Sequence, residues 1–318
     1  MKSLLITGFS NIVESSLLKK INKKKYAISV LLTEEENQKF NRKYDKKFEK
    51  IIIDFDNIQG FKELLQTHSW DIIVHVGTPK KSNNCIKKKY FNVNFKEQLI
   101  INALKNKSKI LYCSSVDVFG TIPLELPANN ETEKVEGKCI RSNFSLTEKI
   151  FFKYLMNGLD AYIIRASLLY GKNVEGFSSF LLKKIINKNL YLPNKKHWIH
   201  LLNIETLIDA LVMIIDNDYS NNRIFLLADK DPILLRDLVN FIYKSIHKKD
   251  FPQNRIIWKK YFFIAEKICS FMKWNDKKRL IQLLNNSWFY ESDFSCERLF
   301  LKKKNTIPSF QEVLNEYN

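Results

Sequence analysis

The sequence predicts an α/β protein: a doubly wound parallel sheet followed by a smaller C-terminal α/β lobe. Two observations predict this fold class. Over the first 165 residues, short apolar runs of strand length alternate with stretches of helical period. No internal repeat and no Pro/Gly/Ser-rich linker interrupts the chain. Strands that alternate with helices are joined by right-handed crossovers, which produce a parallel sheet with helices on both faces.

Six apolar runs are predicted to be buried strands, because they are short, rich in leucine or β-branched residues, and bounded by polar turns. They are residues 3–7, 27–32, 51–54, 72–76, 110–113 and 161–165. Between them, three segments carry apolar residues at helical spacing on one face. These predicted helices are residues 11–21, 92–104 and 141–156.

After Tyr170-Gly171 the alternation loosens, and the sequence predicts the smaller lobe, interleaved with the sheet. Its predicted helices are residues 177–186, 204–215 and 234–246, and its predicted short strands are residues 198–202 and 223–227. The tail from about residue 256 is expected to be helical. Its aromatic residues Trp258, Phe262 and Phe263 fit a packed amphipathic helix better than a base-stacking platform.

The formal net charge of +18 is the strongest compositional signal. A nucleic-acid binder would concentrate this charge in one patch, whereas lysines here recur along the whole chain. Solvated surface lysines are therefore favoured, and attraction to nucleotide phosphates or to an acidic membrane surface is the alternative. No apolar run of 18 residues appears, and the first apolar stretch is too short for a secretory signal. We expect a cytoplasmic protein without a transmembrane segment.

Metal-binding patterns are weak in this sequence. The five cysteines lie far apart without ligand spacing, which predicts reduced structural thiols and no metal site. His197 and His200 form an HxxH pattern without neighbouring Cys or carboxylate partners, so a structural or ligand-contact role is favoured. His75, at the end of a predicted strand, is expected to be a core histidine.

Five segments, in order along the chain, resemble the NAD-dependent epimerase/dehydratase (nucleotide-sugar) family of the extended short-chain dehydrogenases/reductases. They are Ile6-Thr7-Gly8, Asp71–His75, Asn92-Val93, Leu111–Gly120 and Ile164–Gly171. The resemblance covers essentially the whole chain. It implies a Rossmann-like dinucleotide-binding domain over residues 1–170 and a substrate-type lobe over residues 171–318. It also implies NAD or NADP as cofactor, and a nucleotide sugar of surface-polysaccharide metabolism as ligand.

The phosphate-binding loop of this family follows the pattern TGxxGxxG, in which glycines let the backbone approach a pyrophosphate at a helix N-terminus. This sequence keeps Gly8 but has Asn11 and Glu14 at the second and third glycine positions. Asn11 tolerates the left-handed backbone region and can preserve the turn. Glu14 is larger than the glycine that allows close helix–strand packing, and its carboxylate suits the helix dipole in place of a phosphate. We expect a helix N-terminus stabilised by its own glutamate, with retained cofactor binding as the alternative.

Other positions of the cofactor crevice match the family better. Asp54 and Phe55 match its adenine-contacting aspartate and the following residue, and Val76 and Gly77 stand where small residues line the cofactor. The resemblance adds Asn92 to these candidate cofactor contacts. An acidic residue after the second strand would hold the ribose hydroxyls, but the run of glutamates from residue 34 to 36 is more typical of a helix start or an exposed loop.

The catalytic positions depart from the family. There, a tyrosine is the general acid/base, a lysine four residues on binds the nicotinamide ribose and lowers the tyrosine pKa, and a serine positions the substrate oxygen. Residues 146–149 resemble the segment after this motif, which places the tyrosine at Ile140 and the lysine at Phe144. Ser115 matches the serine. No tyrosine lies between residues 112 and 154, so shifting the alignment does not restore the motif.

The sequence therefore predicts a degenerate member of the family, which acts as a non-catalytic nucleotide-sugar binder or partner subunit, or performs altered chemistry. The alternative is a working NAD(P)-dependent epimerase, dehydratase or reductase with another base, such as Asp117, Glu136 or Lys138. A basic nucleic-acid or membrane-surface module is the third hypothesis. The resemblance also implies a homodimer or a partner enzyme, held through a four-helix interface built from residues 92–104 and 141–156.

Overall fold

The computed structural model describes residues 1–8, 12–44, 48–54, 57–76, 85–123, 125–134, 142–219 and 223–315. The chain forms two compact units that are interleaved along the sequence. The first unit comprises residues 1–118, 135–165 and 208–225, and the second comprises residues 119–134, 166–207 and 226–318. The functional division at residue 170 stays a prediction.

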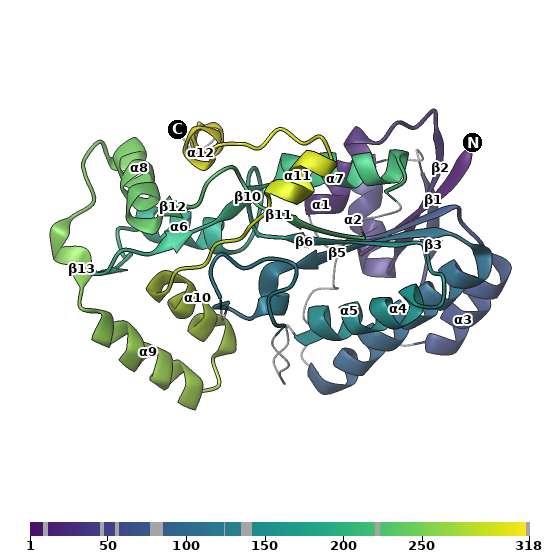
Figure 1. Ribbon diagram of the computed structural model, residues 1–318, viewed down its shortest axis with the longest axis horizontal. Helices are drawn as coiled ribbons and strands as arrows, with labels where there is room; N and C mark the ends of the chain where they lie inside the picture. The colour runs from purple at the N-terminus through teal and green to yellow at the C-terminus, as the bar shows by residue number, and fades with distance from the viewer. Residues whose placement is uncertain are drawn as a thin grey trace. The chain divides into compact units, whose positions relative to one another are not determined.

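A seven-stranded sheet has the strand order β11-β6-β5-β4-β1-β2-β3 (Figure 1). Its strands are β1 (Lys2–Thr7), β2 (Tyr26–Leu32), β3 (Glu49–Ile52), β4 (Ile72–His75), β5 (Lys109–Ser115), β6 (Ala161–Ala166) and β11 (Ile224–Leu227). The pairs β1–β2, β1–β4, β2–β3 and β4–β5 are all parallel. The order 3-2-1-4-5-6 is that of the Rossmann fold, which confirms the predicted fold class.

Helices cover both faces of this sheet. In Figure 1, α3 (Ile58–Thr67), α4 (Cys85–Asn106) and α5 (Ser142–Leu155) lie side by side on one face. On the other face lie α1 (Ile12–Lys20) and α7 (Ile204–Asp216). The helix α2 (Glu34–Tyr44) follows β2. The predicted helices are thus confirmed, although α4 begins seven residues before the expected start at residue 92.

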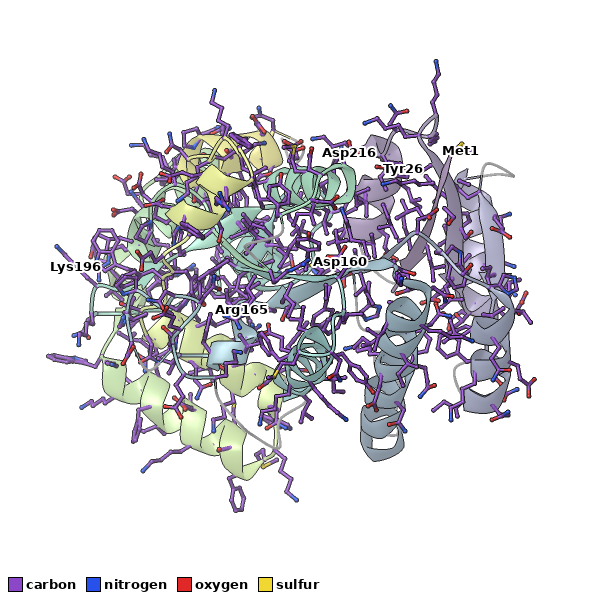
Figure 2. The ribbon with its side chains drawn as sticks, turned by 45° about the vertical axis from the view of Figure 1, so that its right-hand side comes forward. Met1, Tyr26, Asp160, Arg165, Lys196 and Asp216 are labelled. Atoms are coloured by element: carbon purple, nitrogen blue, oxygen red, sulfur yellow. The ribbon has the colours of Figure 1, made fainter. Side chains whose placement is uncertain are left out.

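Two polar contacts attach the end of α7 to strand β2. The Tyr26 hydroxyl donates a hydrogen bond to Asp216 Oδ1 at 2.6 Å, and Lys25 Nζ lies 3.5 Å from Asp216 Oδ2 (Figure 2). Burial and the neighbouring carboxylate raise the pKa of Tyr26 above its ordinary value. Lys20 on α1 also forms an ion pair with Asp209 on α7. The helices on this face are therefore joined to each other and to the sheet.

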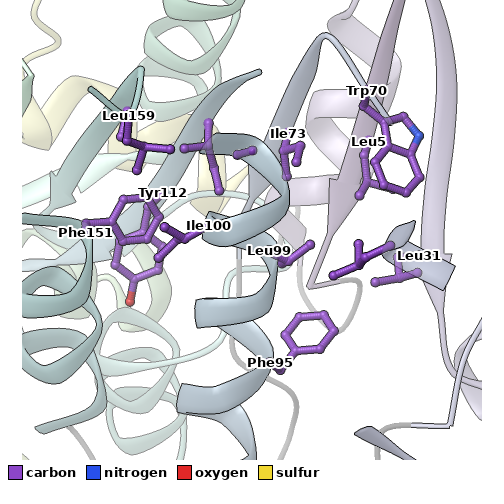
Figure 3. Close-up of a cluster of buried hydrophobic side chains, with 14 of the residues drawn as sticks. Leu5, Leu31, Trp70, Ile73, Phe95, Leu99, Ile100, Tyr112, Phe151 and Leu159 are labelled. Atoms are coloured by element: carbon purple, nitrogen blue, oxygen red, sulfur yellow. The ribbon is translucent and has the colours of Figure 1, made fainter. Parts of the chain in front are cut away.

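The main hydrophobic core of the first unit lies between the sheet and α3, α4 and α5 (Figure 3). The strands contribute alternating buried side chains, and the helices contribute residues at intervals of three and four, as burial of one helix face requires. The labelled members are Leu5, Leu31, Trp70, Ile73, Phe95, Leu99, Ile100, Tyr112, Phe151 and Leu159. The rings of Phe61 and Phe95 stack with their centroids 4.3 Å apart, which joins α3 to α4.

The second unit contains short strands and helices, as predicted for an α/β lobe. Its two-stranded sheets pair β7 (Leu168–Tyr170) with β10 (Leu201–Asn203), β9 (Trp198–Ile199) with β12 (Ile233–Leu234), and β8 (Leu192–Pro193) with β13 (Ile256–Ile257). Its other helices are α6 (Phe177–Ile186), α8 (Leu235–His247), α9 (Lys259–Phe271), α10 (Asn275–Asn285), α11 (Asp293–Arg298) and α12 (Thr306–Leu314). Short 3-10 turns form at Val116–Phe119 and Gln253–Arg255.

Three details of the sequence prediction for this lobe are wrong. The strand expected over residues 223–227 belongs to the seven-stranded sheet, where β11 lies beside β6. Residues 198–202, which were expected to form a single strand, form parts of two strands, β9 and β10, separated by His200. The buried His200 ring makes hydrogen bonds with the backbone of Asp229 and Tyr290. The aromatic residues of α9 are not all packed. Phe262 is buried, but Trp258 is 66% exposed and Phe263 is 53% exposed. Among the described residues, no helix is both long and apolar enough to cross a membrane.

Candidate functional site

The first strand ends in the turn that the glycine motif predicts. Strand β1 stops at Thr7, and Gly8 has φ of +93°, a backbone conformation that residues with a Cβ rarely adopt. The backbone N–H of Val76 donates to the Thr7 carbonyl oxygen at 3.1 Å, so β1 and β4 stay paired up to this turn. Asn11 lies outside the described residues.

Glu14 is the first acidic residue of α1 and its side chain is fully buried. A carboxylate in the first turn of a helix is stabilised by the helix dipole, typically by about 0.3–1 kcal/mol. The same dipole and the free N–H groups of the first turn are what attract a phosphate. Glu14 therefore places a buried carboxyl group at a helix start where the family pattern has glycine.

Asp54 and the start of α2 follow the carboxyl ends of β3 and β2. Asp54 is exposed and follows β3, and its carbonyl oxygen accepts a hydrogen bond from the Asn57 N–H at 3.1 Å. Helix α2 begins at Glu34, so the run of glutamates from residue 34 to 36 starts a helix and does not form an exposed loop. Thr33 caps it, because the Thr33 N–H donates to Glu36 Oε2 at 2.8 Å and the Glu36 N–H donates to Thr33 Oγ1 at 3.2 Å.

Of the remaining predicted cofactor contacts, only Val76 has a described side chain. Val76 is buried directly after β4. Asn92 lies within α4, and its side chain is not described. Phe55 and Gly77 lie outside the described residues. The structure thus brings Gly8 and Val76 together at the carboxyl ends of β1 and β4, where α/β sheets bind ligands.

Two of the positions that the resemblance matches to catalytic residues hold groups used in local structure. Ser115 ends β5, and its Oγ accepts a hydrogen bond from the Asp117 N–H at 3.1 Å within the following 3-10 turn. Phe144, in the first turn of α5, packs against the core with its ring centroid 6.5 Å from that of Tyr112. Ile140 lies outside the described residues, as do Glu136 and Lys138. Phe144 therefore supplies a packed ring at the position that the sequence resemblance matches to the family's lysine.

A fully buried ion pair lies beside these positions. Glu148 on α5 and Arg165 on β6 are both inaccessible, and Arg165 Nη2 donates to Glu148 Oε2 at 2.8 Å. Ser114 on β5 donates its hydroxyl to Glu148 Oε1 at 2.7 Å. The ion pair connects one helix to two neighbouring strands. Both charged residues stand in segments that resemble the family, residues 146–149 and Ile164–Gly171, but the sequence alone indicates no role for them.

Lys96 is a second buried charge that sequence analysis missed. Its side chain on α4 is 2% exposed, and Nζ donates to Thr147 Oγ1 on α5 at 3.1 Å. Nζ also lies 5.3 Å from the ring centroid of Tyr112. Burial lowers the pKa of Lys96 to about 7, so the amine is partly deprotonated at neutral pH. The signal was available, because Lys96 precedes Leu99 and Ile100 by three and four residues on the buried face of α4.

Across the sheet, Thr7, His75 and Tyr112 form a buried row on three paired strands. His75 Nδ1 lies 2.6 Å from Thr7 Oγ1, and the His75 ring stacks on Tyr112 with centroids 5.8 Å apart. Within the described part of the chain, His75 Nε2 has no hydrogen-bond partner. Burial, helped by the charge of Lys96, keeps the pKa of His75 well below its usual value, and burial raises the pKa of Tyr112. The expectation of a core histidine is confirmed, and both rings are neutral at neutral pH.

The second unit has a buried carboxylate network of its own. Asp229 Oδ2 accepts hydrogen bonds from the Tyr170 hydroxyl at 2.8 Å and from Thr306 Oγ1 at 2.7 Å, and Oδ1 accepts from the Asn203 N–H at 3.0 Å. Burial raises the pKa of Asp229 above its ordinary value. His200 Nε2 lies 2.8 Å from the Asp229 carbonyl oxygen, so the ring of this histidine makes a hydrogen bond with the main chain.

Metal ligation has no geometric support in the described residues, which contain no group of three or more His, Cys, Asp or Glu placed to hold an ion. His197 is buried near Lys259 and Lys195, and burial, followed by these charges, lowers its pKa to about 4. His200 likewise has a pKa of about 4, chiefly because of burial. The HxxH pair is therefore neutral and packed at neutral pH.

The chain is similar to solved structures of nucleotide-sugar epimerases. It is 15% identical to UDP-N-acetylglucosamine 4-epimerase from Bacillus cereus, with 98% of each chain covered and a TM-score of 0.68. It is 13% identical to UDP-glucuronic acid 4-epimerase from Bacillus cereus in complex with NAD, covering 96% of this chain and 94% of that one, with a TM-score of 0.70. It is 11% identical to UDP-glucose 4-epimerase with UDP-glucose from Thermotoga maritima, covering 98% and 99%, with a TM-score of 0.68.

At these identities the similarity shows a shared fold. No curated protein sequence matches the chain. The model of the NAD dependent epimerase/dehydratase family, however, matches residues 4–228, which span both the glycine turn and the buried Glu148–Arg165 pair. A match over more than half of the chain agrees with the strand order and with the turn at Gly8. The chain belongs to the NAD-dependent epimerase/dehydratase family.

Proposed function

We propose that this protein is a cytoplasmic nucleotide-sugar binder of the family, a pseudoenzyme in which the tyrosine–lysine chemistry is lost. Position 144 carries the proposal. A phenylalanine ring that packs toward Tyr112 stands where the family reaction needs an ammonium group. Position 140 is isoleucine. Neither residue exchanges a proton, so these two positions supply no general acid or base to a sugar hydroxyl.

The proposal includes weak binding of the dinucleotide. NAD or NADP would place its pyrophosphate at the start of α1, beside Gly8, but the buried Glu14 carboxylate already uses the dipole of that helix. Like charges in a buried setting repel strongly. The residues of this helix start therefore do not fit a pyrophosphate held in the family manner, and we derive no reaction step through the cofactor.

Replacing Glu14 with glycine is expected to raise NAD affinity by about tenfold or more, because a nearby charge in a partly buried site is worth roughly 1–3 kcal/mol. Isothermal titration calorimetry with NAD and with NADP measures the effect. Asp237→Gly, which removes an acidic residue from the first turn of α8, is the matched control and should change nothing. Wild-type affinity equal to that of Glu14→Gly would show that Glu14 does not exclude the cofactor.

The similar structures support the choice of ligand. Their names include UDP-N-acetylglucosamine, UDP-glucuronic acid and UDP-glucose, so uridine diphosphate sugars are the first candidates. We place the protein in surface-polysaccharide metabolism, as a binder or partner subunit. Calorimetric titration with these three nucleotide sugars should give binding in the micromolar range, and no heat of binding with any of them would contradict the proposal.

Altered chemistry is the second candidate function, and Lys96 favours it. Its amine has a pKa of about 7 and bonds to Thr147, one helical turn after Phe144 on α5. A general base is most effective when its pKa lies near the working pH. If the protein turns over a nucleotide sugar, Lys96→Met should abolish turnover. Lys153→Met, at an exposed lysine of α5, the helix that carries Thr147, should not. Turnover retained in Lys96→Met would exclude this base.

We also propose that the protein pairs with a second copy or a partner enzyme through α4 and α5. Both helices lie on the same face of the sheet, and each carries an exposed aliphatic residue, Ile101 on α4 and Leu146 on α5. A four-helix interface would bury these side chains. Ile101→Lys is expected to shift the protein from dimer to monomer in analytical ultracentrifugation, since a buried unpaired lysine is costly. A wild-type monomer at high concentration would argue against the homodimer.

A further inference from the structure

Helix α9 presents an apolar face that the rest of its own unit does not cover. It packs through Phe262 and Cys269, which are buried and seven residues apart on one side of the helix. Polar contacts to α10 fix this side further, with Gln282 Nε2 donating to Glu266 Oε1 at 2.6 Å and Lys278 Nζ donating to Ser270 Oγ at 3.0 Å. Figure 1 shows α9 and α10 as a pair of helices joined by a short turn.

The opposite side of the helix carries the α9 stripe, defined as Tyr261, Ile264, Ile268 and Phe271. Their spacing of three, four and three residues places them on one face. Each side chain is at least half exposed, and Phe271 is 87% exposed. Large exposed apolar patches on soluble proteins usually mark interaction sites.

Exposed apolar residues are concentrated in this segment. Of the twenty large apolar side chains that are exposed in the described part of the chain, eight lie between residues 258 and 274. Besides the α9 stripe, these are Trp258, Phe263, Met272 and Trp274. Tryptophan and phenylalanine side chains at the edge of such a face are typical of helices that lie in a membrane interface.

Basic residues accompany this apolar face. Between residues 258 and 279 there are seven lysines and arginines and two acidic residues, and Glu266 is bonded toward α10. Three lysine ammonium groups lie beside aromatic rings: Lys267 is 4.7 Å from the Phe263 centroid, Lys260 is 5.4 Å from Tyr261, and Lys277 is 3.9 Å from Trp274. Lysine stems that run along an apolar surface keep their charges at its polar border.

We propose that the α9 stripe and its flanking lysines bind an anionic lipid surface, with α9 lying in the plane of the interface. Charge complementarity favours this occupant. The centres of protein–protein interfaces are depleted of lysine, whereas interfacial helices place lysines around an aromatic and aliphatic face. Ile264, Ile268 and Phe271 would supply the apolar area that an interfacial helix buries among lipids. The same side chains would add little to the binding of nucleic-acid phosphates. This assignment is independent of nucleotide-sugar binding, and it would keep the protein at a membrane surface.

Vesicle flotation of the whole 318-residue chain tests the proposal. Vesicles of phosphatidylcholine mixed with an equal amount of phosphatidylglycerol should carry the protein, and pure phosphatidylcholine vesicles should carry much less. Raising the salt concentration should weaken binding to the mixed vesicles, because exposed charges are screened. Equal binding to both kinds of vesicle would overturn the anionic-lipid assignment.

Two double variants locate the surface. Lys260→Gln with Lys267→Gln should weaken binding to the mixed vesicles by about thirtyfold, since each lysine near an anionic surface contributes roughly fivefold. Ile264→Ser with Ile268→Ser should weaken it by at least about tenfold through lost apolar burial. All four side chains are exposed or flank exposed residues, so circular dichroism and thermal melting should match the wild type.

The matched control is Lys24→Gln with Lys62→Gln, which removes the same charge from two exposed lysines of the first unit and should leave vesicle binding unchanged. An equal loss in this control would show general electrostatic attraction and overturn the assignment to α9. Absence of vesicle binding, together with self-association that Ile264→Ser abolishes, would assign the stripe to a second copy of the chain and likewise overturn the proposal.

Discussion

Replacing Arg165 with methionine is expected to lower the free energy of unfolding by about 4 kcal/mol, because it removes the guanidinium group that pairs with the fully buried Glu148 carboxylate. The attraction between the two charges offsets the cost of burying them, so removal of one partner exposes the whole desolvation cost of the other. Urea denaturation followed by circular dichroism measures the loss. A fall of less than about 1 kcal/mol would mean that water reaches the pair.

The matched experiment replaces both partners. Glu148→Leu combined with Arg165→Met should recover most of the stability, since a buried ion pair replaced by apolar side chains of similar volume is often neutral or stabilising. Recovery will be incomplete if the Ser114 hydroxyl, which donates to Glu148, is left without an acceptor. The two single variants and the double variant form a cycle that isolates the interaction between the charges.

Replacing Lys96 with methionine is expected to have the opposite effect and to stabilise the protein by about 3 kcal/mol at neutral pH. The pKa of this lysine is about 7 in the folded chain, lowered by burial from an ordinary value of 10.5. At roughly 1.4 kcal/mol per pKa unit, this shift sets an upper limit of about 5 kcal/mol on the gain. Loss of the hydrogen bond to Thr147 reduces it. Methionine is unbranched and fills the same space.

The pH dependence of this gain follows from the direction of the pKa shift. Below about pH 7 the amine is protonated in both the folded and the unfolded chain, so the folded state bears the full cost of burying the charge. As the pH rises toward 10.5 the unfolded chain loses the proton as well, and the cost disappears. The stability difference between Lys96→Met and wild type should therefore shrink between neutral pH and pH 10. Lys153→Met, at an exposed lysine, should show no such trend, and a constant difference for Lys96→Met would contradict the buried charge.

The sheet was the most predictable part of this protein, because its six apolar runs are short and local in sequence. The pairing of β11 beside β6 was not predictable in the same way. Residues 223–227 were expected to be a strand of the smaller lobe, but strand neighbours depend on contacts between segments far apart in the chain. The break at His200 has the same origin, since its ring bonds to backbone 29 residues further along at Asp229.

The candidate site was predictable where a backbone turn or a residue type was enough. Gly8 adopts the positive φ that its motif implies, and position 144 could be read directly as phenylalanine. Lys96 escaped prediction because lysine is ordinarily a surface residue, although its helical spacing with Leu99 placed it on the buried face. The exposure of the α9 stripe was not predicted either, because its residues are of types that are ordinarily buried. Aromatic residues at helical spacing predict packing, and the sequence does not show which face lacks a packing partner.

The loss of the tyrosine–lysine chemistry is tested most directly by proton NMR of a uridine diphosphate sugar incubated with the protein and NAD. UDP-glucose and UDP-N-acetylglucosamine are the first substrates to try. The anomeric signals should broaden on addition of protein, because the nucleotide sugar binds, and no new anomeric signal should grow with time. Growth of the signal of an epimer or a dehydrated sugar, at a rate proportional to the amount of wild-type protein, would contradict the account.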